Sequence, residues 1–140
     1  MTPSHRMITK KTKHYEKDQT NCSNLNIAHI LHGQIIYVPT DQPTIQAGID
    51  AATNGDTVLV AQGTWFENIN FNGKAITVAS HYLMESDSAH IYNTIINGSD
   101  PSNPDIGTVV TFDSNTDTTS CLYGFTITGG TGTIMPFFSR

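Results

Sequence analysis

Residues 57–98 read TVLVAQGTWFENINFNGKAITVASHYLMESDSAHIYNTIING, and this stretch decides the fold. Short runs of apolar and β-branched residues alternate in it with turn residues such as Asn, Gly and Asp. The runs cover residues 57–60, 69–71, 75–78 and 94–96, and the same pattern continues at 109–112 and 125–127. Because β-branched and aromatic side chains favour extended backbone, the sequence predicts a series of short β-strands.

The starts of these strands are spaced in a way that favours a solenoid. Thr57, Ala75 and Thr94 are 18 and 19 residues apart, and the next start, Thr108, follows after 14. A coil of about 20 residues is too short for a strand–helix–strand unit, which needs about 30. It is also too uneven for leucine-rich repeats. The spacing therefore predicts a β-solenoid.

Three strand runs end in similar turns, which makes an imperfect internal repeat. Gly73, Gly98 and Gly130 stand where a glycine can take a positive φ angle. The first of these turns leaves a second architecture open. Asn72-Gly73 has the composition of a type I′ turn, which would join its two flanking runs in an antiparallel sandwich or jelly roll.

A short strand and a short helix are predicted ahead of the repeat. The run at 35–38 is rich in β-formers and stops at Pro39. Thr44 is an acceptable helix N-cap, and Gly55 is expected as the C′ residue. Apolar residues recur between them at helical spacing, at Ile45, Ile49 and Ala52. Because a solenoid must cover its apolar ends, we expect this helix to cap the first coil.

Charge divides the chain into two regions. Five of the seven basic residues lie before residue 35, whereas residues 35–140 carry ten acids against Lys74 and Arg140. Residues 1–34 are therefore predicted to be a flexible basic extension, and residues 35–140 the cap and first coils. An acidic body repels a phosphate backbone, so nucleic acid is not an expected partner. No stretch of 18 apolar residues predicts a membrane span.

Several motifs in order resemble the opening of pectin-lyase-like right-handed β-helix proteins. The motifs are PTIQAGIDAA (43–52), NGDTVLV (54–60), GTWFENI (63–69), TIING (94–98) and GFTITGG (124–130). The resemblance covers about residues 36–132 and implies an all-β fold. That fold is a right-handed parallel β-helix of about four coils with a short N-terminal capping α-helix. It also implies an extracellular or cell-surface location, although no signal peptide is visible.

The resemblance implies a carbohydrate-associated module that is not an enzyme. Family members include pectin methylesterases and polysaccharide lyases, whose catalytic residues lie on coils after the segment similar to residues 124–130. No catalytic residue carries over, and the match stops near Gly132, as in a truncated chain. An inert fragment of an esterase or lyase is one alternative. Another is an interaction module that pairs, or self-associates, through its open C-terminal β edge.

Trp65, Phe66 and Glu67 are the candidate carbohydrate-binding residues. The two aromatic rings could stack on sugar rings, with core packing as the alternative. Glu67 is a candidate for acid–base chemistry, with hydrogen bonding to turn amides as the alternative. No metal or cofactor is expected, because acids such as Asp100, Asp105, Asp113 and Asp117 match no compact calcium loop. Pairing of Cys22 with Cys121 stays open.

Overall fold

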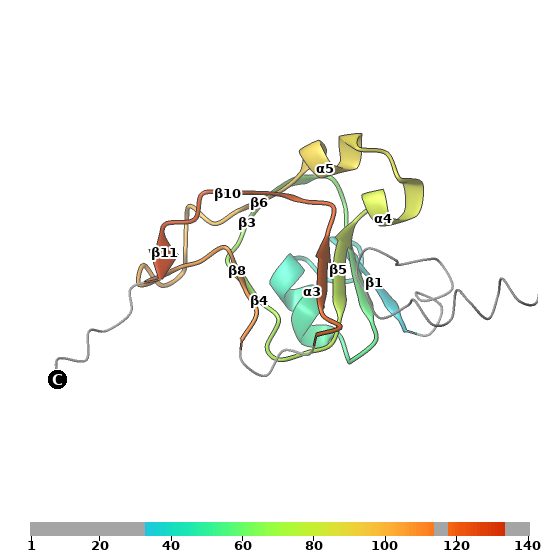
Figure 1. Ribbon diagram of the computed structural model, residues 1–140, viewed down its shortest axis with the longest axis horizontal. Coiled ribbons are helices and arrows are strands. Elements are labelled where there is room, and N and C mark those ends of the chain that lie inside the picture. Colours follow the sequence, from blue (N-terminus) through green and yellow to red (C-terminus); the bar gives the residue numbers. More distant parts are fainter. Residues whose placement is uncertain (1–32, 114–117, 134–140) are drawn as a thin grey trace, which may run out of the picture.

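The computed structural model describes residues 33–113 and 118–133, and strands dominate them (Figure 1). The prediction of an all-β class is therefore confirmed. The predicted extension at 1–34 lies outside the described residues except for Gly33 and Gln34, as do Cys22 and Asp117.

The largest sheet has four parallel strands. They lie in the order β1 (Ile35–Val38), β2 (Thr57–Val60), β5 (Thr77–Ser80) and β9 (Cys121–Tyr123). Val58 is in register with Ile36 on one side and with Val78 on the other. These side chains share one face and are buried in the core. Strands about 20 residues apart in sequence are thus neighbours in space.

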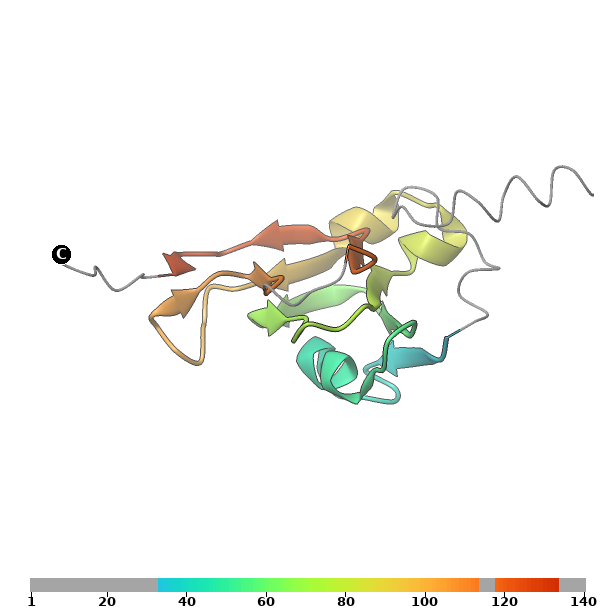
Figure 2. The same ribbon diagram turned by 60° about the horizontal axis from the view of Figure 1, so that its bottom comes forward.

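Two further parallel sheets repeat this arrangement. One has the order β3 (Gly63–Phe66), β6 (Thr94–Asn97) and β10 (Thr126–Thr128), and the other pairs β4 (Ile69–Asn70) with β8 (Val110–Thr111). A small antiparallel pair joins β7 (Ile106–Gly107) to β11 (Gly132–Thr133). The sheets are short and separate. Figure 2 shows the segments in layers, with β1 at one end and β10 at the other.

The hairpin, the alternative that the sequence left open, does not form, although its turn is present. Asn72 and Gly73 both have positive φ angles, 54° and 71°. The strands on either side do not pair with each other, since β4 pairs with β8 while β5 lies between β2 and β9. The turn therefore changes the direction of the chain between two sheets. Gly98 and Gly130 do not have a positive φ, contrary to expectation, although Gly129, beside Gly130, has a φ of 77°.

Helix α3 (Ile45–Ala51) lies against β1, β2 and β4, at the end of the structure marked by β1. The Thr44 side chain accepts a hydrogen bond from the Ala47 amide at 3.1 Å, which confirms the predicted N-cap. Ala52 is the C-cap and has extended backbone, so the prediction that Gly55 is the C′ residue is wrong. Gly55 has a positive φ of 93° in the turn beyond.

Lys74 closes the other end of this helix. Its Nζ donates to three carbonyl oxygens, those of Ile49 and Asp50 at 2.7 Å each and that of Ala52 at 2.9 Å. The last carbonyls of a helix have no partner within the helix, and a cation is favoured beside them. Lys74 therefore satisfies the C-terminal end of α3 from a distant part of the chain.

Asp56 links the segment before β1 to the turn before β2 through hydrogen bonds. Its carboxylate accepts hydrogen bonds from the Gln34 amide at 2.8 Å and from the Thr53 amide and hydroxyl at 2.8 and 2.9 Å. Burial raises the pKa of Asp56, but the hydrogen bonds from Thr53 and Gln34 outweigh that effect. The net result is a pKa below its usual range.

Two short helices stand between β5 and β6, where none was predicted. They are α4 (Tyr82–Glu85) and α5 (Ala89–Asn93). Neither buries a side chain fully, so their sequences carry no helical apolar stripe. His90 Nε2 and Glu85 Oε2 lie 2.8 Å apart and link the two helices.

Candidate functional site

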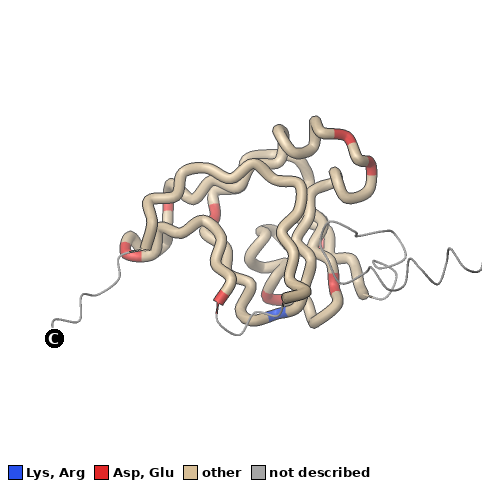
Figure 3. The backbone as a smooth tube through the Cα atoms, in the orientation of Figure 1, with Lys and Arg blue, Asp and Glu red and all other residues tan. Residues whose placement is uncertain are grey.

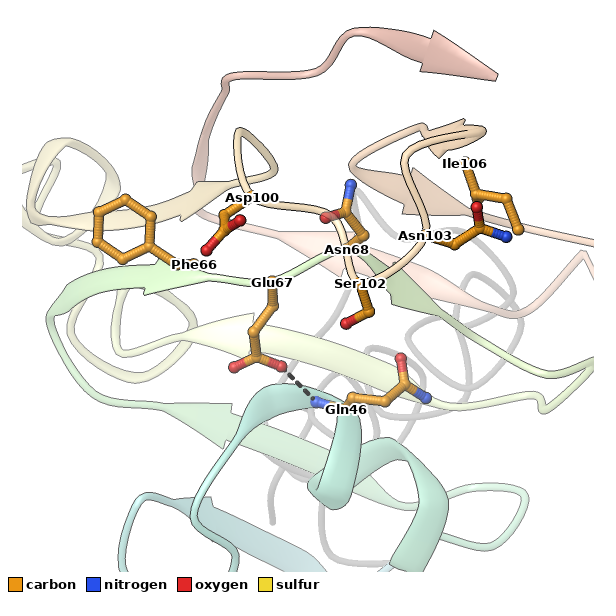
Figure 4. Close-up of a pocket in the computed structure, with 8 residues that line it drawn as sticks. All are labelled: Gln46, Phe66, Glu67, Asn68, Asp100, Ser102, Asn103 and Ile106. Atoms are coloured by element: carbon orange, nitrogen blue, oxygen red, sulfur yellow. Dashed lines mark hydrogen bonds between the residues drawn. The ribbon is translucent and has the colours of Figure 1, made fainter. Parts of the chain in front are cut away.

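Glu67 follows β3 and holds the N-terminus of α3. Its Oε1 accepts the Ile45 amide at 3.0 Å, and its Oε2 accepts the Gln46 amide at 2.9 Å (Figure 4). The first amides of a helix have no partner within the helix, so a carboxylate there is stabilised. Both carboxylate oxygens are thereby engaged. Glu67 bonds to backbone amides, but the amides belong to the helix and not to a turn.

Trp65 packs against the core and is not a surface platform. It lies in register with Ile96, which is fully buried. The indole is partly buried against the hydrophobic cluster, and its Nε1 donates to the Ala61 carbonyl at 3.1 Å. Core packing, the alternative considered for Trp65, is therefore the arrangement that the structure has.

Phe66 faces the opposite way, because successive side chains of a strand alternate between the two faces. It is 62% exposed. Its register partner is Asn97, so the loop that follows β6 runs past Glu67. The structure thus separates the three predicted residues: Trp65 points into the core, Glu67 caps a helix, and Phe66 is exposed.

A cavity of about 320 Å³ opens beside Phe66, between the start of α3 and the loop before β7. Figure 4 shows Phe66 and Ile106 on opposite sides of this cavity. Its lining combines two apolar side chains with amides, a hydroxyl and carboxylates. The residues are Gln46, Phe66, Glu67, Asn68, Asp100, Ser102, Asn103 and Ile106.

Hydrogen bonds fix two walls of this cavity. Gln46 exchanges two hydrogen bonds with the backbone of Asn70, at 2.8 and 3.1 Å. Asn68 Nδ2 donates to the Thr108 carbonyl at 3.0 Å, and its Oδ1 is buried without a partner among the described residues. The Asn103 side chain accepts the Asp105 amide at 3.0 Å. The amide side chains are thus held by backbone rather than by one another.

Sequence reasoning missed most of the lining. From the sequence, Gln46 is predicted only as part of the helix, and Asp100 is considered only as a calcium ligand. No pattern points to Ser102, Asn103 or Ile106 as site residues. One signal was available, because residues 98–105 read GSDPSNPD between two strand runs. A polar, proline-containing insertion of this kind is typical of a surface loop that carries function. Residues 33–113 and 118–133 contain no group of three His, Cys, Asp or Glu side chains suited to a metal ion.

Comparisons of the chain with protein-family models, with curated proteins and with solved structures gave no match. The resemblance seen in the motifs therefore rests on those motifs alone. Within the described part of the chain, no helix is long and apolar enough to cross a membrane.

Proposed function

We propose that the chain forms the cap and first coils of a right-handed parallel β-helix of the pectin-lyase-like kind. Three sheets of parallel strands support this proposal, because each sheet gains one strand per 20 to 44 residues of chain. The helix α3 supports it too, since it lies beside the first strands of two sheets, where a cap is needed.

We further propose that the cavity beside Phe66 binds a carbohydrate without catalysing its breakdown. The observation that carries this proposal is an aromatic ring, 62% exposed, on the rim of a cavity lined with amide, hydroxyl and carboxylate side chains. Sugar rings present apolar faces that pack on aromatic rings and hydroxyls that need polar partners. Asn103 and Ser102 supply such partners opposite the ring.

Charge narrows the class of sugar. The described residues carry nine acids, and their one basic residue, Lys74, is committed to the carbonyls of α3 (Figure 3). Asp100 adds a carboxylate to the cavity itself. An acidic glycan such as polygalacturonate would therefore be repelled. We expect a neutral or methyl-esterified polysaccharide.

The absence of catalysis is proposed from the state of Glu67. General acid–base chemistry needs a carboxyl group that can exchange a proton with the substrate. Both oxygens of Glu67 accept helix amides, so this group is committed to structure. An extracellular or cell-surface location is part of the proposal. It rests on the resemblance of the motifs alone.

The experiment titrates the full chain with methyl-esterified pectin oligosaccharides, neutral galactan oligosaccharides and polygalacturonate oligosaccharides, followed by calorimetry. We expect the chain to bind either the methyl-esterified pectin or the galactan oligosaccharides, and to bind polygalacturonate oligosaccharides more weakly. Phe66→Ala should weaken that binding about tenfold, which corresponds to roughly 1.4 kcal/mol. The matched control is Tyr92→Ala, since Tyr92 is an exposed aromatic residue on α5, away from the cavity.

Two outcomes would contradict the proposal. Equal loss of binding in Phe66→Ala and Tyr92→Ala would mean that sugars bind exposed aromatic rings without a site. Release of methanol or of unsaturated sugars by the wild-type chain, abolished by Glu67→Gln in a folded variant, would show an enzyme.

A further inference from the structure

The interior rows of side chains lose their cover at the last strands. Ile96 is fully buried, whereas Ile127, next in the same row, is 49% exposed. Phe71 is likewise buried, and Phe112, stacked on it with ring centroids 4.2 Å apart, is 47% exposed. Leu122 continues the row of buried valines in the largest sheet and is only partly buried. These side chains form an apolar end face that no described residue covers.

Backbone groups that have no partner among residues 33–113 and 118–133 surround this end face. Strands β8, β9 and β10 are each the last strand of a sheet. In a parallel ladder the N–H and C=O of alternate residues point to opposite sides. The Cys121 amide and the Thr128 carbonyl form hydrogen bonds toward the neighbouring strand of their own sheet. The backbone groups of the alternate residues Leu122 and Ile127 therefore point away from the sheet, toward its open edge. An exposed strand edge of this kind favours pairing with another chain.

At the opposite end, two of the three edge strands have partners on their outer side. On the outer edge of β1, the Tyr37 amide donates to Asp41 Oδ2 at 2.8 Å, and the Tyr37 carbonyl accepts the Asp41 and Gln42 amides. On the outer edge of β4, the Gln46 side chain bonds both backbone groups of Asn70. Helix α3 lies beside these edges. Head-to-tail pairing is therefore hindered at β1 and β4, while β3 is the third edge strand at this end.

Charge distinguishes the end face from the rest of the surface. Residues 118–133, which contain β9 and β10, include no Asp, Glu, Lys or Arg (Figure 3). Natural edge strands usually carry charges that discourage pairing. Elsewhere the described surface is acidic, and Asp113 follows Phe112 at the margin of the end face, so repulsion between two copies is weakest where their β9 and β10 strands meet. The surface therefore fits a second copy better than a charged partner.

We propose that two copies of the chain associate through this end face, tail to tail, and form a closed dimer. The edge strands of the two copies run antiparallel across a two-fold axis, and Leu122, Phe112 and Ile127 of each copy become buried. Because a two-fold contact uses the same end face of both copies, each end face is occupied once the dimer forms, and no third copy can add there. The assembly stops at two and does not grow into a fibre. This inference is independent of carbohydrate binding.

Analytical ultracentrifugation of the full chain between 1 and about 200 μM tests the proposal. We expect a monomer–dimer equilibrium without larger species. Ile127→Lys places a like charge on both copies at the interface and should raise the dissociation constant at least tenfold. Tyr37→Lys, the matched control on β1 at the opposite end, should leave the dissociation constant unchanged. Circular dichroism melting shows whether each variant is folded.

Hydrogen exchange of the wild-type chain supplies a second readout that needs no variant. The amides of Leu122 and Ile127 should exchange more slowly at 200 μM than at 1 μM. Three results would overturn the proposal: a monomer at all concentrations, open-ended polymers, or a dimer that Tyr37→Lys disrupts and Ile127→Lys does not. Protection of these amides in a monomer would mean that another part of the same chain covers the face.

Discussion

Gln46 and Asn70 are joined by a reciprocal pair of hydrogen bonds, in which the Asn70 amide donates to Gln46 Oε1 and Gln46 Nε2 donates to the Asn70 carbonyl. A helix side chain thus takes the place of a neighbouring strand on the outer edge of β4. Glu67 and Lys74 hold the two ends of the same helix. Helix α3 is therefore attached to the sheets by specific polar contacts as well as by its apolar face, and each contact can be tested.

Glu67→Gln should lower the free energy of unfolding by about 1.5–3 kcal/mol, the range for a hydrogen bond to a charged group. The amide that replaces the carboxylate keeps one acceptor oxygen and loses the favourable interaction with the helix N-terminus. Urea unfolding, followed by Trp65 fluorescence, measures the change. Asp105→Asn is the control, because Asp105 lies at an exposed loop position. A loss no larger than in the control would contradict the assigned role.

Lys74→Met should cost about 2 kcal/mol, because three carbonyl oxygens at the end of α3 lose a charged donor. Lys74→Arg should recover only part of this, since a planar guanidinium does not fit three converging acceptors as an ammonium does. The double variant with Glu67→Gln should lose less than the sum of the single losses, because both residues attach one helix. Strict additivity would show that the two ends are independent.

The lowered pKa of the Asp56 carboxyl group should make the stability of the fold depend on pH. The pKa of its carboxyl is below its usual range in the folded state, so Asp56 contributes stability above the unfolded pKa of about 3.9. That contribution is lost as pH falls through the folded pKa. Unfolding free energies at pH 3 and pH 7 should therefore differ less in Asp56→Asn than in the wild type. Asp105→Asn, at an exposed loop position, should keep the wild-type difference.

Gly48→Ala tests how closely α3 approaches the sheet. A Cβ atom at this position would lie 2.7 Å from Val58 Cγ1 and 3.1 Å from Val38 Cγ2. Overpacking of this kind costs about 1–3 kcal/mol, more than the 0.5–1 kcal/mol that alanine gains over glycine in a helix. Unfolding should therefore become easier. Val58→Ala in the same chain should relieve the clash, and a double-mutant cycle that shows no favourable coupling would refute this account.

Local patterns in the sequence predicted the elements that local physics stabilises. Thr57–Val60 and Thr94–Asn97 are rich in β-branched side chains, and the structure places strands there. Thr44 caps the predicted helix through its hydroxyl. The β-helix and its family resemblance stay predictions from the motifs.

Elements that depend on distant partners were missed. Strand β3 begins at Gly63 and is largely exposed, so no run of buried apolar residues marks it in the sequence; pairing with β6 makes it a strand. Strand β9 follows a polar segment and is defined by its register with Thr77–Ala79. The candidate site was only partly predicted for the same reason, because its residues are brought together by contacts between distant segments. Phe66 was predicted, but the loop after Asn97 reaches it only through the pairing of β3 with β6.

The polar contacts around α3 also bear on the order in which the chain folds. Asp56 reaches back 22 residues to Gln34, Glu67 reaches 22 to Ile45, and Lys74 reaches 25 to Ile49. Every one of these contacts therefore closes within residues 34–74. Short loops close fast, and folding of stacked repeats spreads from a first unit to its neighbours. During synthesis, this segment can assemble as a nucleus before the ribosome has made β9 and β10, which then add to a template already in place.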